Sequence, residues 1–148
     1  MDQFLGEYEH SLDAKGRLIL PAKFRAPLEE GAVLSIGKQH CLGVYPRDAW
    51  KRMSESADEA TRDENEGRAS AALTASRTLF ALAQPVNPDS QGRIAISEGL
   101  RKYAGLDKKV VVTGALNRIE IWDEARWAEE KERGAAMLAD APLPGVGA

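Results

Sequence analysis

The residues of this chain that are best suited to chemistry occur in one pattern that is used twice. The stretch DAKGR at 13–17 recurs as DSQGR at 89–93, so a D-x-x-G-R motif is repeated at a distance of 76 residues. An aspartate accepts hydrogen bonds from backbone amides two residues further on, and a glycine permits a positive φ. The planar fork of an arginine binds phosphate, or the O6 and N7 atoms of guanine. These residues therefore indicate recognition of a partner rather than bond breaking.

The D-x-x-G-R spacing supports two interpretations. In the first, the arginine pairs with the aspartate four residues earlier, and the motif only closes a tight turn. In the second, the aspartate and the glycine brace a loop from which cations project toward a partner. The residues assigned to bracing are Asp13, Gly16, Asp89 and Gly92, and those assigned to contact are Arg17, Lys15 and Arg93.

The two loops differ in charge. Lys15 of the first loop has Gln91 as its counterpart, so the second loop carries one positive charge fewer. Because cations drive the approach to a polyanion, we expect the first loop to make the stronger contact. Lys23 and Arg25 follow one short helix further along and are weaker candidates for phosphate contact, chosen for their charge and their proximity in sequence.

The similarity between the two halves extends well beyond the loops. The aligned pairs include Arg25 with Arg101, Tyr45 with Trp122, and Trp50 with Trp127. Self-similarity that persists over about forty residues indicates an internal duplication. The chain is therefore predicted to build one structural unit twice.

Each copy carries signals for three short strands and one short helix. An apolar segment follows each loop, at 18–20 and at 94–96, and suits a buried strand. Pro21 and Ser97 open short helices, the first of barely two turns because Pro27 limits it. Further strands are predicted at 32–36, 41–45, 109–113 and 118–122, joined by turns at 37–40 and 114–117.

Longer helices are predicted after each copy. An Ala- and Glu-rich stretch from residue 49 to about residue 82 indicates a helix with a break near 65–67. Asp123 caps a last helix that extends to about residue 138, and the Pro-, Gly- and Ala-rich end is predicted to be a frayed tail. The residues expected to pack back on the strands are Leu73, Leu79, Phe80 and Leu82.

The composition excludes some classes of protein. The net charge is −3 and the pI about 5.5, which argues against a protein that coats nucleic acid by its overall charge. Any DNA contact then has to come from locally gathered arginines and lysines. No apolar run approaches the roughly 20 residues that span a bilayer, and the N-terminus lacks the pattern of a secretory signal. We therefore predict a cytoplasmic protein with no membrane partner.

Catalytic and metal chemistry find little support. The soft or borderline metal ligands are His10, His40 and Cys41, which are too few for a site. His40 and Cys41 are adjacent in a turn, so we predict an ordinary structural role for both. The sequence has no Walker loop and no dinucleotide fingerprint. We predict that the protein is not an enzyme and uses no metal, cofactor or small-molecule substrate; a hydrolase built on Asp13, Asp89 and His10 would need a pocket that no pattern indicates.

These residues, in this order, resemble the MraZ family of bacterial transcriptional regulators. The resemblance covers nearly the whole chain and rests on FLG at 4–6, LDAKGR at 12–17, LPA at 20–22, YP at 45–46, RKYAGL at 101–106 and IWD at 121–123. It implies an α+β fold with a mainly β core, in which two tandem AbrB-like swapped-hairpin modules form a double-split β-barrel with peripheral helices. We expect the first module at 7–50, a helical connector at 51–82, the second module at 83–126, and a C-terminal helix with a flexible tail at 127–148.

The resemblance also implies a function. It implies sequence-specific binding of double-stranded DNA, at short direct repeats in the promoter of a cell-division and cell-wall gene cluster that includes the protein's own gene. It further implies ring-shaped homo-oligomers and association with the nucleoid. In that family the D-x-x-G-R arginines are the expected DNA contacts, here Arg17 and Arg93. We expect repression by promoter occlusion, with a ring giving avidity to loops that bind weakly one at a time.

A different class of function is also compatible with the loops. In an AbrB-like assembly or protein-binding module, the loops would make salt bridges to a partner protein. Antitoxins of this type bind their toxins through an appended segment, and residues 138–148 lack the aromatic-rich extension that such a role requires.

Overall fold

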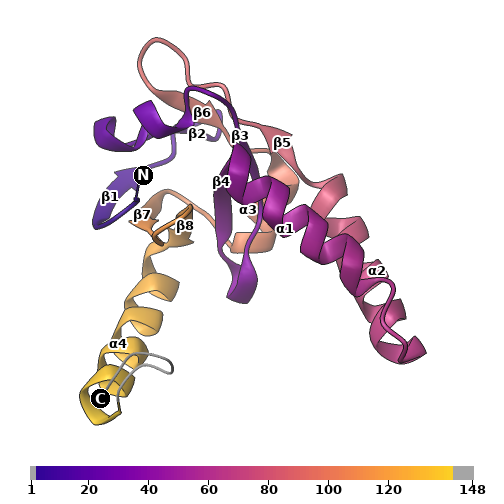
Figure 1. Cartoon of the computed structure of the whole chain (residues 1–148). Helices are drawn as coiled ribbons and strands as arrows, with labels where there is room; N and C mark the ends of the chain where they lie inside the picture. The colour runs from indigo at the N-terminus through magenta and orange to yellow at the C-terminus, as the bar shows by residue number, and fades with distance from the viewer. Residues whose placement is uncertain (1–2, 142–148) are drawn as a thin grey trace.

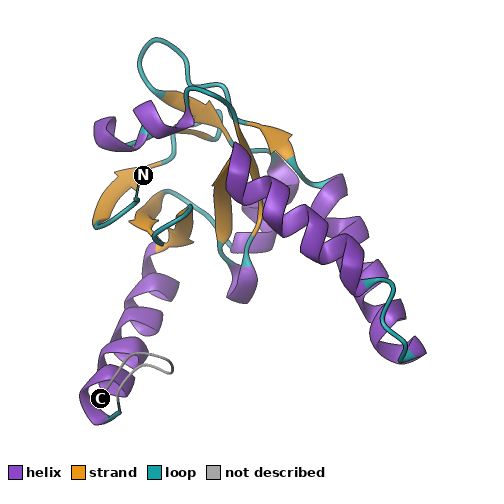
Figure 2. Cartoon of the chain, viewed as in Figure 1, coloured by secondary structure: helices purple, strands orange, loops and turns teal. Residues whose placement is uncertain are grey.

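Antiparallel strands form the centre of the chain in the computed structural model, which describes residues 3–141 (Figure 1). The strands are β1 (Glu7–Ser11), β2 (Arg17–Ile19), β3 (Ala32–Ile36), β4 (Leu42–Pro46), β5 (Gln84–Pro85), β6 (Arg93–Ala95), β7 (Lys109–Gly114) and β8 (Ile119–Asp123). The α-helices are α1 (Arg47–Ala60), α2 (Glu66–Ala81), α3 (Glu98–Ala104) and α4 (Glu124–Asp140). The predicted α+β class with a mainly β core is confirmed (Figure 2).

Strands from the two halves of the chain are interleaved. One sheet has the order β1-β7-β8-β4-β3-β5, and β2 pairs with β6 in a separate two-stranded ribbon. The first strand of each half therefore pairs with the other half, β1 with β7 and β5 with β3. Neither half completes its own sheet.

The register of two strand pairs relates the halves by an approximate two-fold axis. Leu18 lies opposite Ile94 in the ribbon, and these two residues occupy equivalent positions in the repeat. Gly43 lies opposite Glu120 in the same way, where β4 pairs with β8. Where a residue pairs with its own equivalent, a two-fold axis passes between the two, which is the arrangement expected of a duplicated unit.

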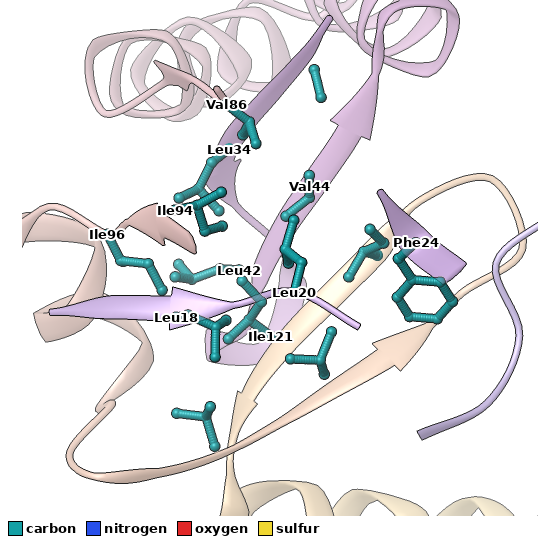
Figure 3. Close-up of a cluster of buried hydrophobic side chains, with 14 of the residues drawn as sticks. Leu18, Leu20, Phe24, Leu34, Leu42, Val44, Val86, Ile94, Ile96 and Ile121 are labelled. Atoms are coloured by element: carbon teal, nitrogen blue, oxygen red, sulfur yellow. The ribbon is translucent and has the colours of Figure 1, made fainter. Parts of the chain in front are cut away.

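One hydrophobic core serves both halves (Figure 3). Leu18, Leu20 and Leu34 of the first half pack with Ile94, Ile96 and Ile121 of the second, and all are at most 3% exposed. Phe24 makes edge-on contacts with Phe4 and Tyr8, with ring centroids 5.4 and 5.3 Å apart. Burying each side chain of this size contributes about 1.5–3 kcal/mol. The strand exchange is therefore driven by apolar faces that only the partner half can cover.

The predicted helix after Pro21 is not an α-helix. The segment forms two 3-10 helices, η1 (Ala22–Phe24) and η2 (Ala26–Leu28), closed by hydrogen bonds such as Phe24 N–H to the Pro21 carbonyl at 2.9 Å. Pro27 has no N–H to donate and blocks an α-helical turn around it. The equivalent segment of the second copy has no proline and forms α3, which Ser97 caps and Gly105 ends with a φ of 62°.

The long helix predicted from residue 49 divides earlier than expected. α1 ends at Ala60, and Asn65 caps α2 by accepting a hydrogen bond from the Arg68 N–H at 2.9 Å, so Gly67 lies inside a helix. α1 and α2 run side by side away from the strands, and α4 extends from β8 in another direction (Figure 1). None of the helices within residues 3–141 is long and apolar enough to cross a membrane.

The face predicted on α2 packs only in part. Leu82 packs against the core, whereas Leu73 and Phe80 remain 41% and 40% exposed, and the Phe80 ring contacts Trp50 of α1 at 5.9 Å. The prediction was wrong for these two residues because most of α2 pairs with α1, and only its C-terminal end meets β3, where the Ser35 hydroxyl donates to the Leu79 carbonyl at 2.6 Å. α4 continues to Asp140, past the predicted start of the tail, and the remainder of that tail, 142–148, lies outside the described residues.

Candidate nucleic-acid interface

The first D-x-x-G-R loop is a tight turn built around one carboxylate. Oδ1 of Asp13 accepts hydrogen bonds from the N–H groups of Lys15 and Arg17, both at 2.9 Å. Oδ2 of Asp13 accepts from Nε of Arg17 at 2.7 Å. Gly16 has a φ of +73°, which a glycine adopts without the steric cost that a side chain adds.

The second loop repeats this geometry bond for bond. Oδ1 of Asp89 accepts from the N–H groups of Gln91 and Arg93 at 2.9 Å, and Oδ2 accepts from Nε of Arg93 at 2.7 Å. Gly92 has a φ of +79°. The ion pair between aspartate and arginine, which the first interpretation of the motif expects, is thus present in both loops. It holds each guanidinium in one orientation.

The pairing of β2 with β6 brings the two arginines onto one exposed face. Successive residues of a strand point to opposite sides, so the buried pair Leu18 and Ile94 occupies one side of the ribbon. Arg17 and Arg93 occupy the other side at diagonal positions: Arg17 lies opposite Ala95, and Arg93 lies opposite Ile19, which is 44% exposed. We call this surface the ribbon face.

Both arginines keep donors available on the ribbon face. Each uses Nε for its aspartate, and the Nη groups make no hydrogen bond to any residue within 3–141. Their side chains are 33% and 30% exposed. A guanidinium held at one edge with its other donors free is suited to clamp an oxygen pair of a phosphate or a base edge.

The other predicted contact residues lie in different settings. Lys15 is exposed at the tip of the first loop. Lys23 places its ammonium over the Tyr8 ring, 5.1 Å from the centroid. Arg25 is part-buried and donates from Nε and Nη2 to the Leu20 carbonyl. It lies against Gly92 of the second loop, although the first loop is nearer to it in sequence.

The sequence reasoning missed Arg101, which stands beside the first loop. It is the equivalent of Arg25 in the repeat, and its guanidinium lies where a Cβ on Gly16 would come within 2.9 Å of Cζ. Its Nε donates to the Ile96 carbonyl at 3.1 Å. The alignment of Arg25 with Arg101 was the available signal, but only the fold shows which loop each one meets.

Cys41 and His40, two of the soft or borderline metal ligands, lie in different settings. Cys41 is fully buried, and burial together with the Glu120 carboxylate raises the pKa of its thiol, so the reactive thiolate is disfavoured. The His40 ring stacks on Tyr103 at 5.2 Å. Among residues 3–141, no three His, Cys, Asp or Glu side chains gather as a metal site would require.

Comparison with known proteins agrees with this arrangement of two similar halves. A family model described as "MraZ protein, putative antitoxin-like" matches residues 3–72 and again residues 79–141. The chain belongs to the MraZ family. Proteins named transcriptional regulator MraZ match it at 44% identity in Saccharopolyspora erythraea and 46% in Frankia alni, over 97% of this chain and 99% of each relative. The one from Pediococcus pentosaceus is 43% identical over 87% of both chains.

The two segments that the MraZ family model matches each contain one D-x-x-G-R loop.

The hydrogen bonds of each loop lower the pKa of its aspartate. The Arg93 N–H and then the Arg93 side chain lower the pKa of Asp89 to about 2 from the ordinary 3.8. The Arg17 N–H likewise lowers the pKa of Asp13. A lowered pKa in the folded state stabilises the fold above the unfolded value, and this contribution is lost as the pH falls from about 4 to about 2.

We therefore expect the side-chain carboxyl carbon of Asp89 to titrate by NMR with a midpoint near pH 2. A midpoint for Asp89 at the ordinary 3.8 would show that the loop is open in solution.

Proposed function

We propose that this protein is a transcriptional regulator that binds double-stranded DNA with its ribbon face. The observation that carries the proposal is the placement of Arg17 and Arg93 on one exposed face, each oriented by a carboxylate through Nε and each with Nη groups that bond no other residue of the described part of the chain. The names of its MraZ relatives support the same class of function.

The shape of the ribbon suits the DNA major groove. That groove is about 12 Å wide and admits a two-stranded antiparallel ribbon. Ile19 and Ala95 complete this face with apolar side chains that can contact the base edges, and each guanidinium then reaches a guanine edge or a flanking phosphate.

The charge of each loop accounts for weak binding by one chain. In the first loop Lys15 and Arg17 face one carboxylate, whereas in the second loop Asp89 balances Arg93. Because each loop offers at most one net positive charge, a tight complex needs several loops acting together. We propose a ring-shaped homo-oligomer that places these loops on successive direct repeats and binds with avidity.

The finer features of this proposal follow the MraZ resemblance. The exchanged strands form a swapped-hairpin, double-split barrel, and the first loop makes the stronger contact. The DNA is the promoter of a cell-division and cell-wall gene cluster that includes the protein's own gene, and binding there represses transcription within the nucleoid.

A titration tests the proposal directly. Purified full-length protein is titrated against a labelled duplex from upstream of its own gene and against a shuffled duplex of equal composition, at several salt concentrations, with fluorescence anisotropy as the readout. We expect tighter binding to the upstream duplex and an affinity that falls as salt rises. Equal affinity for both duplexes would rule out sequence-specific binding. No binding at low salt would rule out DNA as the partner.

A further inference from the structure

Each D-x-x-G-R loop has a guanidinium from the other half of the chain packed on its glycine. Arg101 of α3, in the second half, lies on Gly16 of the first loop; a Cβ there would sit 2.9 Å from both Cζ and Nε of the arginine. Arg25, in the first half, lies on Gly92 of the second loop, where a Cβ would meet its Nε and Cζ at even closer range. The contacts are reciprocal across the two-fold axis.

Backbone hydrogen bonds join the same groups. Ile96 donates from its N–H to the Gly16 carbonyl at 3.0 Å, and its own carbonyl accepts from Nε of Arg101. Leu20 donates to the Gly92 carbonyl at 2.9 Å, and its carbonyl accepts from Nε and Nη2 of Arg25. In each case the residue that directly follows the paired strand bonds both the loop glycine and the arginine that covers it.

This arrangement requires both residue types. Without a Cβ, the glycine leaves room for a flat guanidinium to lie against the loop backbone, and it adopts the positive φ that the turn needs. The guanidinium is planar and donates from its edge, so it can cover the glycine and bond a carbonyl at the same time. A lysine in its place would keep the charge but lose this flat contact.

We propose that Arg101 and Arg25 are positioning residues that set the two loops in a crossed manner, Arg101 for the first loop with Arg17, and Arg25 for the second loop with Arg93. Each loop is thus held by the half of the chain that does not contain it. For Arg25 this replaces the phosphate contact expected from its charge. The effect on DNA rests on the proposed function, whereas the effect on loop rigidity does not.

The crossed assignment of Arg101 and Arg25 predicts that each affects the loop that is more distant from it in sequence. If these arginines acted on the nearest loop along the chain, Arg101 would affect the loop at 89–93, which begins 12 residues before it. The structure instead predicts that a change at Arg101 alters the loop at 13–17 and leaves 89–93 as it was. Arg25 is expected to show the reverse pattern.

Hydrogen exchange of the full-length protein without DNA tests the loop assignment. The variants are Arg101→Gln, Arg101→Lys and Arg25→Gln, with Lys102→Gln on the exposed side of α3 as the matched control. We expect both Arg101 variants to speed amide exchange in the first loop roughly fivefold or more, with the second loop unchanged. Faster exchange only in 89–93, in both loops equally, or in neither would overturn the proposal.

Double-mutant cycles of DNA affinity test the functional consequence. Arg101→Gln is expected to be non-additive with Arg17→Ala by roughly threefold or more and additive with Arg93→Ala, because Arg101 packs on Gly16 and residues that share a backbone shift are coupled. The opposite pattern of coupling would overturn the crossed assignment. If DNA affinity responds to none of these variants while the exchange pattern holds, the proposed function fails and the bracing of the loops stands.

Discussion

The Arg17→Ala, Arg93→Ala double variant is expected to bind the upstream duplex at least roughly 30-fold more weakly than the unaltered protein, because an arginine that bonds a base or phosphate contributes about 1–3 kcal/mol. Both arginines lie on the ribbon face, and their Nη groups have no partner among residues 3–141, so both DNA contacts are lost in the double variant. Of the single variants, Arg17→Ala is expected to weaken binding more, since Lys15 adds charge only to the first loop.

Anisotropy titrations over a range of salt concentrations measure this effect. Each phosphate contact that is lost lowers the slope of log K against log salt by about 0.9, whereas a lost base contact lowers the discrimination against a shuffled duplex. Arg77→Ala, at an exposed arginine of α2, is the matched control and should bind as the unaltered protein does. Full affinity in the double variant would rule out the ribbon face as the DNA-binding surface.

Phe24→Ala is expected to lower the free energy of unfolding by about 3–5 kcal/mol, which is a large part of the 5–15 kcal/mol typical of a protein domain. Phe24 is 2% exposed, and its ring contacts both Phe4 and Tyr8. The ring therefore joins η1 to β1, the strand that pairs with the second half. Its removal leaves a cavity where the two halves meet.

Urea unfolding followed by circular dichroism, at one protein concentration, measures this loss, because association would otherwise change the apparent stability. Phe80→Ala is the matched control: this ring is 40% exposed and contacts Trp50, so its loss should be less than half as large. An equal loss at both positions would contradict a core centred on Phe24.

Features that depend on neighbours in sequence were predicted well. The turn of each D-x-x-G-R loop involves groups two to four residues apart, so the sequence contains all its partners. The caps of α3 and α4, at Ser97 and Asp123, were predicted for the same reason. The hairpin turn at 114–117 was also found, although Leu116 takes the positive φ, at 68°.

The errors occur where a tertiary contact outweighs a local preference. β1 and β5 were not predicted as strands, because β1 has a single large apolar residue, Tyr8, and β5 is two residues long. Both exist because a strand of the other half offers an unpaired edge. Leu73 and Phe80 were assigned to a buried face, but α2 pairs with α1, which leaves both partly exposed.

By itself, the sequence determined that one unit occurs twice, that each copy presents an arginine on an aspartate-braced turn, and that the chain resembles the MraZ family. Only the tertiary structure decided that β2 pairs with β6, that Arg17 and Arg93 share one exposed face, and that Arg101 and Arg25 cross over to the opposite loops. The physical reason is the range of the interactions. Turn hydrogen bonds are local and visible in the spacing of residues, whereas strand pairing across 76 residues is selected by the burial of apolar faces that neither half can cover alone.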